Sequence, residues 1–305
     1  MLIENFLLIV NQVGMLFLLA VVGYVLAKVK LITKDGTQQI TNVLLFAAIP
    51  ATIIKSFDMP FDRERLFWMS MAALIIALIY VLGILISMMF FNKENDMQRP
   101  VYKATMIYPN CTFIALPIVL ALVGEAGVFY VSIYATVHAV FLWTHCVMLM
   151  TGRQGGVSAK NLLNPGMIAT GIGVALFFSP FRLPGAVRGA ANVLSGISTP
   201  LAMIIIGEFI AGKKLLSIFI QKKIYFVTFI RLIVIPLIVM VVLRYLQIPD
   251  VMRKACLIGV SAPTAITVVM VTARFSRDAE LASDIAAFCT LCSVITLPLL
   301  LVLVI

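Results

Sequence analysis

The sequence predicts an all-α polytopic membrane protein whose ten transmembrane helices form two inverted five-helix repeats. Composition is the first observation: the 305 residues are 62% hydrophobic and only 12% charged, whereas soluble domains average about 45–50% apolar and about 25% charged. Ten apolar runs are the second, and proline landmarks that recur in both halves are the third. No soluble fold of this length buries so large an apolar excess, so lipid must surround most of the surface.

The ten apolar runs are predicted membrane spans, because a spanning helix needs about 20 mostly apolar residues. We number them in chain order. They cover residues 5–27, 38–57, 66–91, 101–123, 126–150, 165–181, 190–211, 223–246, 252–273 and 281–305. This pattern predicts a first five-helix repeat over 1–150, a connection over 151–164 and a second five-helix repeat over 165–305.

Matching landmarks occur at corresponding places in the two halves. Asn42-Val43-Leu44 precedes Pro50, and Asn192-Val193-Leu194 precedes Pro200 at the same spacing, 150 positions later. Pro109 and Pro263, inside spans four and nine, form a second pair at an offset of 154. Paired interruptions of hydrophobic segments are typical of secondary transporters, whose binding sites lie at the breaks.

An odd number of spans in each half makes the second repeat inverted. Fourteen Lys and Arg residues fall in the connections after spans one, three, five, seven and nine; eight fall on the other side, and Arg231 lies inside span eight. Because cytoplasmic loops carry the excess of basic residues, we expect the connection 151–164 in the cytoplasm and both termini outside a cell (inner) membrane. The net charge of +10 is scattered over these short loops, so we reject a nucleic-acid partner.

The proline breaks are the predicted binding site. A proline removes a backbone donor, and irregular backbone is tolerated in lipid only where it is buried or lines a cavity. Each break also creates a half-helix N-terminus, which favours a carboxylate. A plain kink stays the alternative for either break alone, but the matched pair favours a site for a small organic anion. The predicted substrate-binding residues are Pro109, Asn110, Thr112, Ser261, Pro263, Thr264 and Thr267.

The residues around the breaks resemble the auxin efflux carrier family. Span four reads Pro109-Asn110-Cys111-Thr112-Phe113-Ile114-Ala115-Leu116-Pro117 and is followed by Val123-Gly124-Glu125-Ala126-Gly127. The second half reads Ala262-Pro263-Thr264, then Ala273-Arg274-Phe275-Ser276-Arg277-Asp278-Ala279-Glu280-Leu281-Ala282-Ser283, and ends near Thr296-Leu297-Pro298. The resemblance covers essentially the whole chain, and bacterial members of the family are permeases for malate, malonate and similar acids.

The resemblance implies that spans four and nine cross at the membrane centre. It implies a scaffold of spans one, two, six and seven that also forms a homodimer, and a mobile transport group of spans three to five and eight to ten in an elevator-type mechanism. Asn110 matches a binding position of the family. Thr264 stands where some plant members carry another polar residue, and Ala115 stands where many relatives have glycine. The long loop of plant members between spans five and six is absent, which favours a smaller, prokaryotic-type permease.

A few ionisable residues within spans are candidates for a coupling ion or proton. Glu208, Asp284 and His138 are such candidates, since acids and histidines inside a membrane often serve transport. The alternatives are an interfacial Glu208, which is favoured, and an Asp284 that complements a helix N-terminus. A hydrogen-bonded buried side chain is the favoured alternative for both His138 and His145. Lys55 and Arg231 are expected to extend toward the membrane surface from span ends.

Other functions are less consistent with the sequence. No nucleophile motif, phosphate-binding loop or metal-ligand cluster occurs, so we expect no enzyme activity, no cofactor and no metal. A sodium-coupled organic-acid symporter of the bile-acid type and a non-transporting membrane sensor remain alternatives to the permease. Expected partners are the organic anion, a coupling proton or sodium ion, membrane lipid and a second copy of the chain.

Overall fold

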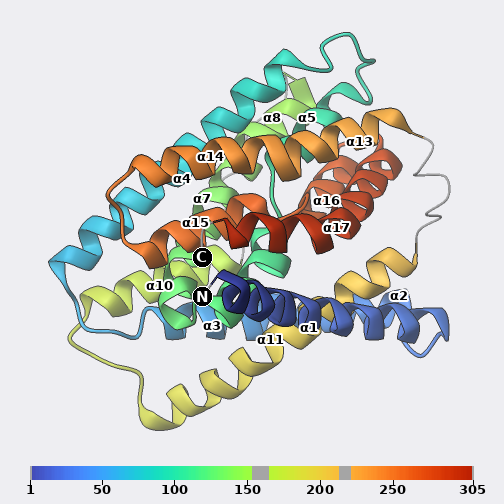
Figure 1. The fold of residues 1–305 in the computed structure, drawn as a ribbon. Coiled ribbons are helices and arrows are strands. Elements are labelled where there is room, and N and C mark those ends of the chain that lie inside the picture. The colour runs from blue at the N-terminus through green and yellow to red at the C-terminus, as the bar shows by residue number, and fades with distance from the viewer. Residues whose placement is uncertain (1, 153–164, 213–220, 304–305) are drawn as a thin grey trace.

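A computed structural model describes residues 2–152, 165–212 and 221–303. Helices make up the architecture, and the described residues contain no strand apart from one isolated bridge between Pro109 and Thr264. Most of the predicted connection 151–164 lies outside the described residues. The helices pack into one bundle, and α11 passes obliquely behind α1, with which it is in extensive contact (Figure 1).

Each predicted span coincides with helical residues. Single helices form five of them: α1 (Leu2–Lys28), α4 (Arg63–Met89), α10 (Pro165–Phe178), α11 (Gly185–Ala211) and α17 (Ala279–Val302). Three others include a π-helical segment: α2 (Lys34–Val43), η1 (Leu44–Ala48) and α3 (Ile49–Ser56); α7 (Glu125–Phe141), η3 (Leu142–Cys146) and α8 (Val147–Thr151); α13 (Lys222–Phe229), η5 (Ile230–Val234) and α14 (Ile235–Tyr245).

Spans four and nine are broken at the predicted prolines. The first consists of α5 (Arg99–Ile107), then η2 (Cys111–Ala115) and α6 (Leu116–Leu122), and the second of α15 (Asp250–Ser261) and α16 (Ile266–Arg274). Seven helical stretches of the described chain are long and apolar enough to cross a membrane by length and composition. The two broken stretches and the 14-residue α10 fall outside that group, so the count of ten spans stays a prediction.

The landmarks around Pro50 and Pro200 differ in structure. Pro50 follows the π-helical segment η1 at the start of α3, whereas Pro200 lies inside the uninterrupted helix α11. The spacing of the two copies is therefore the same, but only the first is associated with a change of helix type.

Short polar side chains begin several of the helices. The carboxylate of Asp62 accepts a hydrogen bond from the Glu64 N–H at 3.0 Å before α4. Asp278 accepts one from the Leu281 N–H at 3.0 Å before α17. Such caps satisfy first-turn donors that have no partner within the helix.

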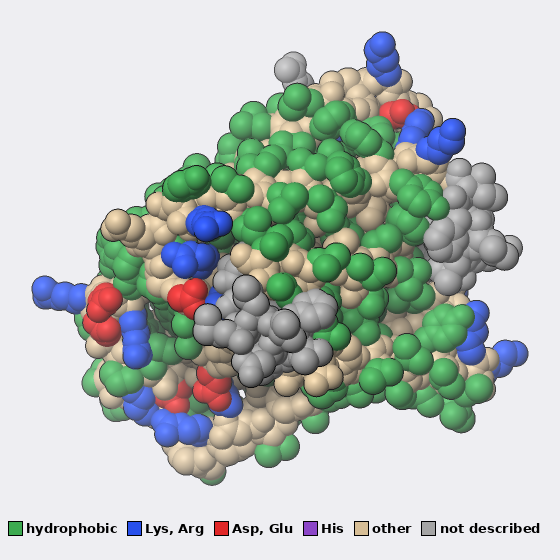
Figure 2. Space-filling model, viewed as in Figure 1, with side chains coloured by type: hydrophobic (Ala, Val, Ile, Leu, Met, Phe, Trp, Pro, Cys, Tyr) green, Lys and Arg blue, Asp and Glu red, His purple; other side chains and the backbone are tan. Residues whose placement is uncertain are grey.

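The side chains at the molecular surface are those expected of a protein in lipid. Hydrophobic side chains cover the middle of the face in Figure 2, and charged side chains gather toward its ends. Helix α4 illustrates this, because Leu74, Leu78 and Leu85 on it are more than half exposed. This surface and the seven apolar helices identify a multi-pass membrane protein.

Glycines allow α1 and α11 to pack closely. A Cβ atom added at Gly207 would overlap the carbonyl oxygen of Ala20, and one added at Gly23 would overlap that of Ile204. Small residues at such crossings are the usual means by which membrane helices approach each other.

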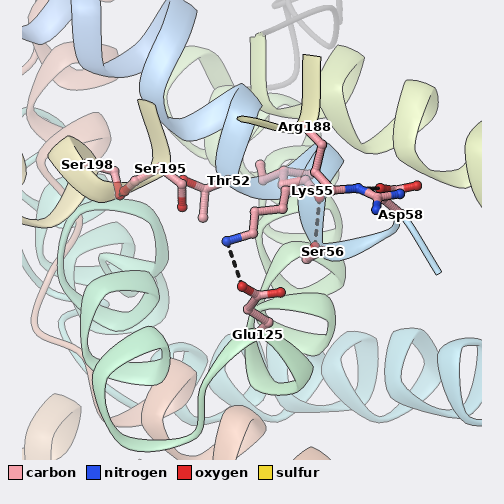
Figure 3. Close-up of polar contacts among 9 residues, drawn as sticks. Thr52, Lys55, Ser56, Asp58, Glu125, Arg188, Ser195 and Ser198 are labelled. Atoms are coloured by element: carbon pink, nitrogen blue, oxygen red, sulfur yellow. Dashed lines mark hydrogen bonds and ion pairs between the residues drawn. The ribbon is translucent and has the colours of Figure 1, made fainter. Parts of the chain in front are cut away.

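Polar contacts join connections that the count of basic residues assigns to the same side of the membrane. Arg277 donates hydrogen bonds of 2.7 Å to the carbonyls of Met150 and Asp96, which brings together the connections after spans nine, five and three. Lys55 pairs with Glu125 at 2.6 Å, which joins the connections after spans two and four (Figure 3). Connections that follow odd-numbered spans thus contact one another, and connections that follow even-numbered spans contact one another.

Candidate functional site

The two proline breaks lie against each other. Pro109 and Thr264 form an antiparallel bridge, in which the Asn110 N–H donates to the Pro263 carbonyl at 2.7 Å. The Ala265 N–H donates to the Tyr108 carbonyl at 3.0 Å. Each break therefore satisfies backbone groups of the other, as irregular backbone at membrane depth requires.

Thr264 satisfies a carbonyl that Pro109 leaves without a donor. In a regular helix the N–H of residue 109 would bond to the carbonyl of Thr105, but proline has no N–H. The Thr264 hydroxyl donates to that carbonyl at 2.7 Å, and its side chain is completely buried. The contact gives Thr264 a structural part in holding the crossing together.

Arg231 satisfies the carbonyls of the other break, and our expectation that it extends to the membrane surface is wrong. The residue is only 1% exposed. Its guanidinium donates to the Val260 carbonyl at 2.6 Å and to the Ala262 carbonyl at 3.0 and 3.2 Å. The end of α15 offers these acceptors only because the helix stops before Pro263, and the sequence of span eight does not reveal that neighbour.

Lys55 extends from the end of α3 to an exposed partner, in keeping with the expectation for a lysine near a span end. Its ammonium group pairs with the Glu125 carboxylate, and its side chain is 21% exposed. The pairing joins the end of α3 to the start of α7, so Lys55 connects two helical stretches.

Beside the crossing lies a cavity of about 160 Å³. The side chains and backbone around it are largely apolar. Its lining comprises Leu45, Ile49, Ile53, Pro109, Asn110, Cys111, Thr112, Phe113, Leu116, Ala135, His138, Ala139, Leu142, Trp143, Pro165, Gly166, Ala265 and Thr267. The first turns of η2 and α16 contribute to this lining, so two half-helix N-termini border one cavity.

Asn110 is the polar side chain best placed to bind a ligand there. It is 3% exposed, and its Oδ1 accepts a hydrogen bond from the Phe113 N–H at 3.1 Å. Its Nδ2 is buried without a hydrogen-bond partner among the described residues. A buried amide donor with no partner is costly, and a ligand acceptor in the cavity would satisfy it.

The other predicted substrate-binding residues divide into two groups. Thr112 and Thr267 line the cavity, and the Thr267 hydroxyl has no hydrogen-bond partner among the described residues. Ser261, Pro263 and Thr264 lie behind it in the α15 break and do not line it. The structure therefore gathers Pro109, Asn110, Thr112 and Thr267 at one cavity.

Both histidines have tyrosine partners. His138 lines the cavity, and its Nδ1 lies 2.7 Å from the hydroxyl of Tyr80 on α4. His145 Nδ1 lies 2.8 Å from the hydroxyl of Tyr108. Hydrogen-bonded histidines, the favoured interpretation of the sequence, are therefore what the structure contains, and His138 is also within reach of a ligand.

The remaining ion candidates lie away from this cavity. Glu208, near the end of α11, lines a second cavity of about 380 Å³ together with Lys34 at the start of α2. Asp284 is partly buried in the early part of α17 and lines neither cavity. Within the described ranges, no group of three or more His, Cys, Asp or Glu could hold a metal ion.

Sequence reasoning missed two residues of the site. Arg231 was visible as a charge inside span eight, which is by itself a signal of function, but its distance from the proline landmarks hid its connection to them. Tyr80 gave no signal, because a tyrosine in a long apolar helix is ordinary until its partner is known.

Comparison with known families places the chain in a transporter family. The family model described as "Membrane transport protein" matches residues 8–161 and 155–301. No curated protein matches the sequence. The match extends over nearly the whole chain and includes both breaks and the cavity between them. The protein is a membrane transporter and belongs to the membrane transport protein family, of the auxin efflux carrier type that the motifs resemble.

Proposed function

We propose that the protein is a secondary permease for small organic anions, mono- or dicarboxylates, that bind in the cavity beside the crossing. One observation carries the proposal: the buried Nδ2 of Asn110 has no hydrogen-bond partner among the described residues and borders a cavity at two half-helix N-termini. Such N-termini favour negative charge and offer N–H donors.

The cavity lining offers separate contacts for the carboxylate and for the carbon skeleton of the substrate. The carboxylate accepts hydrogen bonds from Asn110 Nδ2 and from N–H groups of the first turns of η2 and α16. The Thr267 hydroxyl supplies a further donor, and the apolar wall formed by Leu45, Ile49 and Ile53 contacts the carbon skeleton. Among the described residues that line the cavity there is no Lys or Arg, so neutral donors provide the direct contacts and the affinity is modest.

We further propose an elevator-type mechanism with α1, α2–α3, α10 and α11 as the scaffold and α4–α8 and α13–α17 as the transport group. The cavity lining supports it, because Ile49 and Gly166 come from the scaffold and Asn110 and Thr267 from the transport group. A site at such a boundary opens to either side when one group moves against the other.

The proposal also includes the orientation of the chain in the membrane and a homodimer. Ten spans in two inverted repeats put both termini outside a cell (inner) membrane and the connection 151–164 in the cytoplasm, as the fourteen-to-eight charge count indicates. Contacts between connections of the same parity support this alternation. The scaffold is also the proposed homodimer surface, and malate and malonate are the first substrates to test.

Proteoliposomes containing the purified chain test the proposal. Counterflow of lactate, malate and malonate is compared with that of lactamide, malonamide and a cationic amine. We expect transport of one or more of the acids and little transport of the amides and the amine. Faster transport of the amides or the amine than of every acid would refute an anion permease.

A further inference from the structure

Arg231 carries a positive charge into the centre of the transport group. It lies in η5, the π-helical segment of span eight, and among the described residues it has the largest side chain that is less than 2% exposed. An arginine in this position stays protonated, because its side chain keeps its proton even in poorly solvated surroundings. The charge is therefore a permanent feature of the crossing.

No acid neutralises this charge within the described part of the chain, where no ion pair involves Arg231 and its hydrogen bonds go to the carbonyls of Val260 and Ala262. The ionisable groups around it are Tyr80, Tyr134, Cys111, Cys289 and His138, none of which carries a negative charge in its ordinary form. The carbonyls at a helix C-terminus carry only about half of an elementary negative charge, so the crossing retains a net positive charge.

The guanidinium occupies the place that a coupling cation would take. In transporters with broken helices, the carbonyls at half-helix C-terminal ends are typical ligands of sodium ions. Here the end of α15 presents Val260 and Ala262, and both carbonyls already accept hydrogen bonds from Arg231. A sodium ion at this position would have to displace a buried cation that cannot leave.

The charge also acts on the cavity. Cys111 and His138 line the cavity, and Arg231 lies near enough to both for its charge to act on a charge placed at either residue. Ala262, which Arg231 binds, lies just before the first turn of α16, whose Thr267 lines the same cavity. In surroundings of low dielectric such a charge is screened only weakly, so it favours an anion over a neutral analogue.

We propose that Arg231 is a built-in cation that replaces a coupling sodium ion at the crossing and gives the cavity its preference for anions. Resting on the proposed function, this inference adds the residue that sets charge selectivity and the independence of transport from sodium. Arg231 is a positioning residue, because it acts through the α15 carbonyls and its electric field and does not line the cavity.

The wild-type protein gives the first test. Uptake of radiolabelled malonate and lactate into proteoliposomes is measured in sodium chloride and in choline chloride of equal osmolarity. We expect the same rates in both media within twofold. A loss of uptake in choline that sodium restores would overturn the proposal.

Variants at position 231 give the second test. We expect Arg231→Gln to lower the ratio of lactate to lactamide uptake at least tenfold and Arg231→Lys to keep most of it. The control is Arg244→Gln, the same change at an exposed position on α14 of the same span, which should leave the ratio unchanged. An unchanged ratio in Arg231→Gln would overturn the proposal, because a merely structural role alters amounts and not selectivity.

The outcomes separate this inference from the proposed function. If the wild type transports none of the acids, the permease proposal fails and the role of Arg231 fails with it. If it transports them but needs sodium, or if Arg231→Gln keeps its selectivity, only the inference about Arg231 is refuted. If Arg231→Gln does not fold, the inference is tested by the lactate-to-lactamide ratio in Arg231→Lys and by wild-type uptake in choline chloride. A tenfold fall of that ratio in Arg231→Lys would count against a role for charge alone.

Discussion

At the scale of single residues, the crossing depends on side chains that replace backbone partners lost to proline. Thr264 supplies the donor that Pro109 lacks, and Arg231 binds the carbonyls at the end of α15. Asn110 differs from both, since one atom of its amide caps η2 and the other has no partner in the described structure. Structural and ligand-binding roles thus meet within a few residues.

Asn110 allows these two roles to be separated. Asn110→Asp keeps an oxygen to cap the Phe113 N–H but replaces the free donor by a negative charge. We expect organic-anion affinity to fall at least tenfold, because a hydrogen bond to a charged group contributes about 1.5–3 kcal/mol. Burial of the new charge should also lower thermal stability, so binding is measured as the thermal shift that malonate causes in each variant relative to the same variant without ligand.

The matched control for this change is Asn42→Asp, on an exposed position of α2 away from the cavity. It should leave affinity unchanged. Equal affinity in Asn110→Asp and in wild type would show that the Asn110 amide does not contact the substrate.

Thr264 should behave as a structural residue. Thr264→Val keeps the shape but leaves the Thr105 carbonyl without its donor, so we expect about 1–3 kcal/mol of destabilisation. Thr264→Ser retains the hydroxyl and should recover most of it. Thermal unfolding in detergent measures both, and a Val variant as stable as wild type would contradict the role that we assign to this hydrogen bond.

At the scale of helices, interruption and close packing have different sequence signals. The breaks in spans four and nine follow directly from prolines with polar neighbours. The contact between α1 and α11 depends on Gly23 and Gly207, which look like any other glycines in apolar helices. Only the approach of the partner backbone distinguishes them.

Two glycines of α11 make a matched pair for testing this contact. Gly207→Ala places a methyl group on the Ala20 carbonyl, and we expect about 1–3 kcal/mol of destabilisation from overpacking. Gly196 in the same helix has nothing within 4 Å of an added Cβ, so Gly196→Ala should be neutral or stabilising. Equal melting temperatures for the two variants would show that the helices do not approach as closely as described.

At the scale of the whole molecule, function depends on which helices move together. The Lys55–Glu125 ion pair crosses from the proposed scaffold to the transport group, whereas Arg188–Asp58, at 2.8 Å, joins two parts of the scaffold (Figure 3). An exposed ion pair contributes little stability, about 0–1 kcal/mol, so the first pair can break during transport at low cost.

Cross-linking tests this division into two groups. In a background without the native cysteines, Lys55→Cys with Glu125→Cys is joined by a short bifunctional thiol reagent. We expect malonate uptake to stop, because the transport group is tethered to the scaffold. The control, Asp58→Cys with Arg188→Cys, should cross-link without loss of uptake. Full uptake by the cross-linked 55–125 protein would contradict the elevator division.

Orientation in the membrane is a further prediction for the whole molecule. A cysteine at Ser276, in the connection after span nine, should react with an impermeant thiol reagent only after cells are opened. A cysteine at Arg63, in the connection after span two, should react in intact cells. The reverse pattern would invert the topology that the basic residues indicate.

The sequence by itself determined the class of the molecule, its helical stretches and the position of both breaks. These features depend on composition and on prolines, whose effects are local: apolar length makes a membrane helix, and a missing N–H ends one. The transporter family also followed from motifs along the chain, and the family match confirms it. Asn110, Thr112 and Thr267 were named for the same local reason, as polar neighbours of a break.

Only the tertiary structure decided which of those polar residues face the cavity. Thr264 and Asn110 look equivalent in sequence, yet the Thr264 hydroxyl donates to the Thr105 carbonyl, whereas the Asn110 amide nitrogen has no partner among the described residues. Arg231 seemed to belong to a membrane surface, but it lies 31 positions from Ala262 along the chain and binds its carbonyl. Hydrogen-bond partners so far apart are chosen by how the helices pack, and no local pattern of residues records that choice.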